Sequence, residues 1–148
     1  MNELFNTTFE VSLRILLILN ESSKKISVER ITSIDFIATY GKEFEISDYN
    51  LNGDNKYKFS EYSNKRKIIL EAVKTLILND YVKLTCNKQG FNYSITKEGK
   101  KLCKSMNNDY ETNFSNTVKQ GHLKYGKYTD RELINYINKC AVDAIGVK

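Results

Sequence analysis

The sequence predicts a mostly α-helical α+β fold, on three observations. Most of the chain carries apolar residues three and four positions apart, which is the spacing of a buried helix face. Residues 82–95 differ, because apolar and polar side chains alternate there on both sides of Asn87-Lys88-Gln89-Gly90, as in a β-hairpin. The length of 148 residues, with 41% hydrophobic and 28% charged residues, is typical of one globular domain. We therefore expect residues 1–148 to form a single domain.

Two helix starts are predicted near the N-terminus. Thr7-Thr8-Phe9-Glu10 has the pattern of a capping box, and the run after it is apolar nearly all round, which predicts burial on several sides. Ser27 opens a second helical pattern. Arg14 lies inside the first apolar run, where an unpaired guanidinium would be strongly destabilising. We expect Arg14 to reach the rim of the core or to find a partner of opposite charge.

The next segment is predicted to be a long loop followed by a third helix. Lys42 to Ser60 shows no sustained periodicity, and a loop of this length in a small domain is usually functional or mobile. From about Tyr62 to Leu78 the apolar residues recur on one helical face. With Ile69 pointing inward and about 100° per residue, the outward residues are Asn64, Lys67, Glu71 and Lys74.

The third helix and the hairpin lead into a further motif, Tyr93-x-Ile95-Thr96-x-x-Gly99-x-x-Leu102. It is similar to the end of the wing in many bacterial winged-helix proteins. Thr96 would cap the next helix, and Gly99 would permit close packing because it has no side chain. We therefore predict a winged-helix-like domain with the hairpin as its wing, an arrangement that serves DNA readers and protein-binding modules alike.

A C-terminal helical extension is predicted from about residue 107. Tyr110, Phe114 and Val118 form an apolar stripe at positions i, i+4 and i+8. Thr129-Asp130-Arg131-Glu132 is a second capping box, and it opens the last predicted helix. We see no linker that would divide the chain.

The net charge of +5 allows contact with nucleic acid but does not require it. In a winged-helix protein that reads DNA, the outward face of the third helix enters the major groove. Here that face carries two positive charges and one negative charge, which is a poor recognition surface. Contact with the DNA backbone, or ordinary solvation, would explain the basic residues equally well. The candidates for nucleic-acid contact are Lys65, Arg66, Lys67, Lys74 and the wing-tip residue Lys88.

No catalytic, cofactor-binding or metal site is expected. His122 is the one histidine and has no partner at a catalytic spacing, so we expect it at the surface. The cysteines Cys86, Cys103 and Cys140 form no C-x-x-C pair, which fits a reducing cytoplasm. The apolar stretch 13–19 is too short to span a membrane. The sequence therefore predicts a cytoplasmic protein that is not an enzyme and has no membrane partner.

Three stretches in the first half of the chain carry a family resemblance. The first is Phe5-Asn6-Thr7 with Glu10-Val11-x-Leu13-Arg14, and the second is Ile34-Asp35-Phe36. The third is Leu51-Asn52-Gly53-Asp54-Asn55, continuing through Tyr57-Lys58-Phe59-Ser60-Glu61 to Arg66. With these, the sequence resembles the middle component of bacterial ABC-three-component systems, which is encoded beside an SMC-like ATPase. The resemblance implies a non-catalytic subunit that joins the ATPase in anti-phage or anti-plasmid defence, related in logic to Lamassu-type systems.

The loop from Tyr49 to Glu61 has a composition that suits this role. Aromatic side chains supply contact area and polar ones adapt to a partner, although a loop without any partner would look the same. The expected partner-binding residues are Tyr49, Asn52, Asp54, Tyr57, Phe59 and Glu61. Arg14 and Asp35 are better explained as an internal ion pair between the first two helices.

Two functional hypotheses follow. The first is an adaptor that binds the SMC-like ATPase through the loop and the C-terminal helix, with DNA reached, if at all, through the complex. The alternative is a winged-helix DNA-binding transcriptional regulator.

Overall fold

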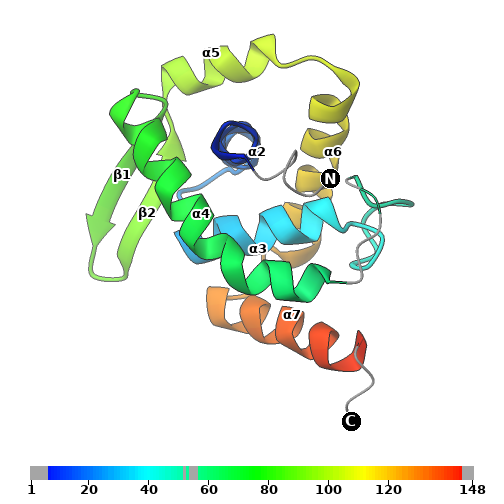
Figure 1. Cartoon of the computed structure of the whole chain (residues 1–148). Coiled ribbons are helices and arrows are strands. Elements are labelled where there is room, and N and C mark those ends of the chain that lie inside the picture. Colours follow the sequence, from blue (N-terminus) through cyan, green and yellow to red (C-terminus); the bar gives the residue numbers. More distant parts are fainter. Residues whose placement is uncertain (1–6, 52, 54–56, 145–148) are drawn as a thin grey trace.

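The computed structural model describes residues 7–51, 53 and 57–144, and confirms the predicted α+β class that is mostly α. The described part contains six helices and one antiparallel hairpin (Figure 1). The helices are α2 (Thr8–Asn20), α3 (Val28–Thr39), α4 (Lys58–Leu78), α5 (Lys97–Ser105), α6 (Asp109–Tyr125) and α7 (Asp130–Ala144). The strands are β1 (Val82–Asn87) and β2 (Gly90–Ile95). None of the described helices is both long and apolar enough to cross a membrane.

The predicted helix caps are present. Thr7, Ser27, Thr96 and Thr129 each accept a hydrogen bond from the backbone NH three residues later, at 3.2, 3.0, 3.1 and 3.1 Å. These bonds satisfy NH groups that a helix start otherwise leaves without a partner. Asn108 makes a further capping box, which ends the preceding connection and starts α6. The sequence therefore determines locally where most of the helices begin.

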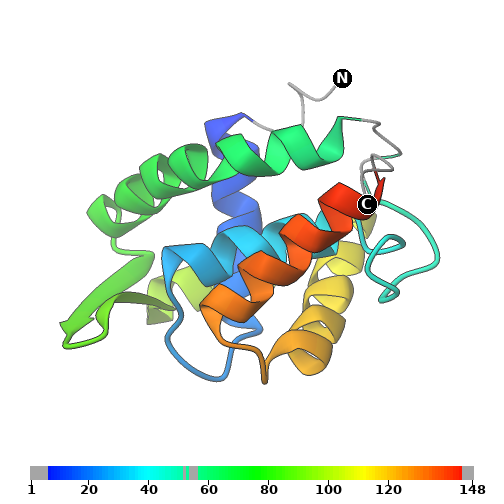
Figure 2. The same cartoon turned by 90° about the horizontal axis from the view of Figure 1, so that it is seen from below.

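Helix α2 is the centre of the fold (Figure 1). It contacts α3, α4, α5, α6 and β2, which explains why its sequence is apolar nearly all round. Its buried side chains, with those of α3, α4, α6 and the base of the hairpin, form the main core. A second cluster, rich in aromatic rings, lies where α7 packs on α3 (Figure 2). The extension predicted from about residue 107 is thus packed against the helices that precede it.

The hairpin joins the body of the domain at its base. Val82 pairs with Ile95 and Leu84 with Tyr93, and Ile26 forms a one-residue bridge to Tyr93. Position 99 requires glycine because the backbone of Tyr81 packs closely against it. A Cβ at this position would lie 2.4 Å from the Tyr81 carbonyl oxygen. The order of three helices, hairpin and helix is the predicted one, and the winged-helix assignment stays a prediction.

The long loop predicted from Lys42 to Ser60 is wrong at both ends. At its start Phe44 is 1% exposed, and the Ile46 NH donates to the Gly41 carbonyl, so this part folds as turns on the core. At its end, α4 begins at Lys58 because the Phe59 ring packs against Phe36, with ring centroids 5.5 Å apart. The polar residues between these aromatic anchors hide them from a periodicity search.

Candidate interaction surfaces

The apolar face of the hairpin is buried at its base and exposed at its tip. Val82 and Tyr93 belong to the core, whereas Leu84 is 43% exposed and Phe91 is 59% exposed. Pairing places Leu84 opposite Tyr93 and Phe91 opposite Cys86, so all four side chains share one face. The hairpin therefore carries apolar surface beyond the body of the domain.

This face forms one wall of a groove of about 690 Å³, which we call the apolar groove. The other wall is α4, which diverges from the hairpin after the short connection between them (Figure 1). Helix α4 contributes Leu70, Val73 and Ile77 to this wall. Exposed charged side chains of Arg66 and Lys74 also line it. The result is an apolar trough with charged residues among its walls, large enough for side chains of a partner.

The predicted outward face of α4 is confirmed, because Asn64, Lys67, Glu71 and Lys74 are all exposed. Two positive charges on or beside this face, Arg66 and Lys74, are matched by neighbouring carboxylates. Arg66 Nε lies 2.7 Å from Glu29 Oε2, and Lys74 Nζ lies 3.5 Å from Glu71 Oε1. Such exposed pairs add little to stability, but they reduce the positive potential that would attract a DNA backbone.

The prediction that Lys65 contacts nucleic acid is wrong. Its side chain is buried, with Nζ 3.0 Å from Asp35 Oδ2 and 3.6 Å from Glu61 Oε1. Lys65 points inward from α4, and its buried charge is tolerated because Asp35 neutralises it. Lys65 is therefore part of the core and cannot reach a phosphate on the surface.

The expected internal pair between α2 and α3 is confirmed. Arg14 Nε lies 2.7 Å from Asp35 Oδ1, and both side chains are buried. Burial by itself raises the pKa of Asp35, but the positive charges of Arg14 and Lys65 outweigh burial and lower the pKa to about 2. Asp35 thus stays ionised and joins α2, α3 and α4 at one point.

The predicted partner-binding loop is divided by the structure. Tyr49 and Tyr57 are exposed, as a contact surface requires. Two of the predicted residues are turned inward instead. Phe59 packs on Phe36, and Glu61 accepts a hydrogen bond of 3.0 Å from the Tyr40 hydroxyl. These two are corrected to structural roles. The predicted residues Asn52 and Asp54 lie outside the described part of the chain.

Tyr49 borders a groove of its own, of about 930 Å³, between the turns after α3 and helix α6. Leu123 and Lys124 of α6 line this groove opposite Tyr49 and Ile46, and Leu123 is exposed. We call this surface the loop groove. Because Tyr49 lines it, part of the predicted contact loop borders a groove. Fewer apolar side chains line the loop groove than line the apolar groove beside the hairpin.

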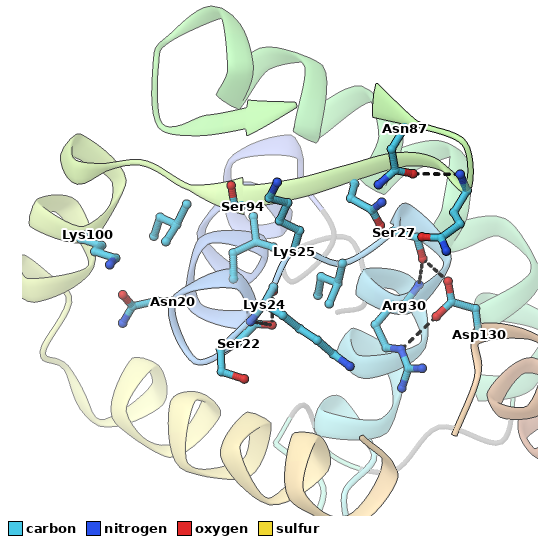
Figure 3. Close-up of a pocket in the computed structure, with 16 residues that line it drawn as sticks. Asn20, Ser22, Lys24, Lys25, Ser27, Arg30, Asn87, Ser94, Lys100 and Asp130 are labelled. Carbon is cyan, nitrogen blue, oxygen red and sulfur yellow. Dashed lines mark hydrogen bonds and ion pairs between the residues drawn. The ribbon is translucent and has the colours of Figure 1, made fainter. Parts of the chain in front are cut away.

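A third groove, of about 700 Å³, lies on the polar side of the hairpin (Figure 3). We call it the basic groove, because the exposed residues Lys24, Lys25 and Lys100 line it. Its acid, Asp130, is held by Arg30, whose Nε lies 3.0 Å from Asp130 Oδ1. Of the residues predicted for nucleic-acid contact, Lys67 and Lys88 are exposed but line none of these grooves.

The residues that line these grooves are mostly absent from the sequence predictions. Leu84 and Phe91 belong to the alternating pattern of the hairpin, which does not by itself tell whether the domain covers them. Their exposure is indicated by the length of the alternating pattern, which continues up to the turn at Asn87. The body of a small domain covers only the base of such a hairpin. Lys24 and Lys25 carry no sequence prediction, and the signal for them is two adjacent lysines before the Ser27 cap, which mark an exposed basic turn.

His122 and Cys103 are side chains that could take part in chemistry, but both are at least partly buried in the fold. The expected surface position of His122 is wrong, since it is half-buried with Nε2 3.2 Å from the Ile18 carbonyl oxygen. Burial lowers the pKa of His122, and burial raises the pKa of the Cys103 thiol to about 11. Within residues 7–51, 53 and 57–144, no three His, Cys, Asp or Glu side chains gather as metal ligands would.

Comparison with protein families places the chain. The family described as ABC-three component (ABC-3C) system Middle Component 2 matches residues 4–146, which is nearly the whole chain. No curated protein and no solved structure matches it.

Proposed function

This chain belongs to the ABC-three component system Middle Component 2 family, and from that membership we propose that it is a non-catalytic adaptor subunit that binds an SMC-like ATPase. A middle component is one part of a multi-component system, so protein partners are implied by the family itself. The proposal adds the identity of the partner, the adaptor role and a task in anti-phage or anti-plasmid defence. These rest on the resemblance of the sequence and on the surfaces described above.

One observation carries the proposal, namely the exposed apolar stripe at the hairpin tip beside α4. Leu84 and Phe91 face a groove whose opposite wall also offers aliphatic side chains. Burying such surface is the main favourable term in protein association, at about 25 cal/mol per Å² before the costs of association. Aromatic side chains near the centre of an interface often dominate its binding energy. Phe91 is the residue best placed to do so here.

The same groove argues against the regulator hypothesis. A regulator that reads DNA would present α4 to the major groove. Two of the basic residues on or beside that face, Arg66 and Lys74, are already paired with acids. The wall toward the hairpin is apolar, which suits a protein partner better than a phosphate backbone.

The occupant that fits is an amphipathic helix of the ATPase. A helix lays apolar side chains three and four positions apart into a groove of this kind, as in other helix-in-groove complexes. The walls carry charges of both signs, since Glu29 and Asp130 line the groove together with Arg66 and Lys74. We therefore expect the polar edge of that helix to carry both signs as well.

The test is co-expression of the tagged chain with the SMC-like ATPase of its own system, followed by pull-down at 50 and 200 mM salt. The double variant Leu84→Asp/Phe91→Asp should lose the ATPase at both salts, because it places two charges in an apolar contact. The matched variant is Tyr49→Asp/Leu123→Asp, which makes the same change in the loop groove and should retain the complex.

The outcomes separate the site from the function. Failure of the native chain to bring down the ATPase contradicts the adaptor proposal itself. Loss of the ATPase only in the Tyr49→Asp/Leu123→Asp variant would keep the adaptor role and move the contact to the loop groove. Unfolding is checked by thermal denaturation of each variant alone, where exposed substitutions are expected to matter little.

A further inference from the structure

Helix α5 presents an almost unbroken basic face. At about 100° per residue, Lys97, Lys100, Lys101 and Lys104 fall within roughly a third of the helix circumference. Gly99 and Cys103 are the buried residues of this helix, so the lysines face outward. Glu98, the acid of α5, forms an ion pair with Lys101, with Oε1 3.4 Å from Lys101 Nζ. Three lysines of this face remain without a described carboxylate within ion-pair distance.

The connection from α2 to α3 adds two more positive charges beside this face. Lys24 and Lys25 are exposed, and with Lys100 they line the basic groove (Figure 3). Asp130, the acid among the described residues that line the groove, pairs with Arg30, and nearby Glu21 has Oε1 3.9 Å from Lys119 Nζ. Lys24, Lys25 and Lys100 therefore leave the lining of the groove with an excess of positive charge over its one described acid.

Most of the other residues that line the groove carry neutral hydrogen-bonding side chains, beside the apolar Leu19, Ile26 and Ile95. The neutral polar residues are Asn20, Ser22, Ser23, Ser27, Asn87, Gln89, Asn92 and Ser94. Amides and hydroxyls of this kind, together with lysines, are what proteins use to contact phosphates and sugars. The described residues that line the groove include no aromatic ring, so it offers no platform on which an unpaired base could stack.

We propose that the basic groove and the outward face of α5 bind the phosphate backbone of double-stranded DNA without reading its sequence. The span from Lys97 to Lys104 is about 10 Å, over which a duplex presents about six phosphates. The basic groove and the apolar groove share a border at Ser27, Gln89, Asn92 and Asp130, but the lysines Lys24, Lys25 and Lys100 line only the first and Leu84 and Phe91 line only the second. The inference does not depend on the adaptor role, and one subunit can hold a protein and DNA at once.

The experiment measures fluorescence anisotropy of a labelled 30-base-pair duplex of mixed sequence titrated with the full chain from 50 to 200 mM salt. Four or five phosphate contacts predict a slope of log affinity against log salt near −4. The variants Lys24→Glu/Lys25→Glu and Lys100→Glu/Lys104→Glu should each weaken binding at least tenfold and reduce the slope by about 2. Shuffling the sequence of the duplex should leave affinity unchanged.

The control is Lys67→Glu/Lys74→Glu, which makes the same change in net charge on the outward face of α4 and should bind as the native chain does. Equal losses in all three variants would mean that net charge alone attracts DNA, which overturns the proposal. Loss confined to the α4 variant, tighter binding of a single strand than of the duplex, or no binding at 50 mM salt would overturn it too. The groove variants should still bring down the ATPase, so a failed adaptor role and a failed DNA site are told apart.

Discussion

The two faces of the hairpin differ in chemistry although they belong to the same twelve residues, 82–95 without the turn pair. One face carries Leu84 and Phe91 toward α4, and the other carries Ser94 toward Lys24 and α5. Alternation along a strand makes this separation, because neighbouring side chains point to opposite faces. A hairpin that projects from a helical body can thus offer an apolar surface to a protein and a polar one to an anion.

The difference also shows what the helical body contributes. Each face is completed by a different helix, since α4 supplies the aliphatic wall and α5 supplies the lysines. Both helices are held by α2, through the ionic cluster of Asp35 with Arg14 and Lys65 and through direct packing on α5. Variants that act on this shared support should remove both surfaces, and variants on one face should remove one.

The largest effect is expected for Asp35→Ala, which leaves the buried cations Arg14 and Lys65 without their shared carboxylate. Removing one partner of a buried ion pair typically lowers the free energy of unfolding by about 3–5 kcal/mol, and we expect a loss of this size here. Urea denaturation measures the change. The control Glu29→Ala breaks an exposed pair with Arg66 and should cost under about 1 kcal/mol. A similar small cost for both variants would mean that Asp35 does not join the helices.

A smaller effect is expected from acid. The pKa of Asp35 is lowered to about 2 in the fold from an ordinary value of 3.8, so the charged cluster stabilises the fold fully above pH 4. This contribution, on the order of 2 kcal/mol, is lost as the pH falls from 4 through 2. Urea midpoints measured from pH 6 to pH 2 follow it. The isosteric variant Asp35→Asn should lack this part of the acid dependence, and an unchanged profile would contradict the assignment.

The smallest effect on stability, and the sharpest comparison of the faces, is expected from Leu84→Thr and Ser94→Val. Each changes one face of β-sheet surface and should alter the free energy of unfolding by under about 1 kcal/mol. Leu84→Thr should weaken ATPase binding and spare DNA, while Ser94→Val should weaken DNA binding and spare the ATPase. Affinity measured for both partners shows the pattern. Parallel losses in either variant would mean that the faces do not work separately.

Sequence patterns predicted the elements well where the signal is local. The caps at Thr7, Ser27, Thr96 and Thr129 depend on residues three positions apart, and the hairpin depends on alternation around one turn. The close packing at Gly99 was also predicted from its motif. The Arg14 pair with Asp35 was predicted because a buried charge requires a partner.

The failures share a different cause, which is that burial depends on what packs from elsewhere. Phe44 and Lys65 stand among polar neighbours, and only the approach of α3 and the aromatic cluster makes them core residues. The candidate sites suffered most from this. Exposure of Leu84 and Phe91 follows from the width of the body beneath the hairpin, and the gathering of Lys24 with Lys100 follows from the packing of α2 on α5.

The central claim is that a partner protein covers the apolar groove. Amide hydrogen exchange of the full chain, alone and in the purified complex with its SMC-like ATPase, tests it most directly. The account predicts new protection in residues 84–91 and 70–77, with residues 97–104 unchanged in the absence of DNA. Protection confined to residues 42–51 and 120–124, with the hairpin tip exchanging as in the free chain, would contradict it.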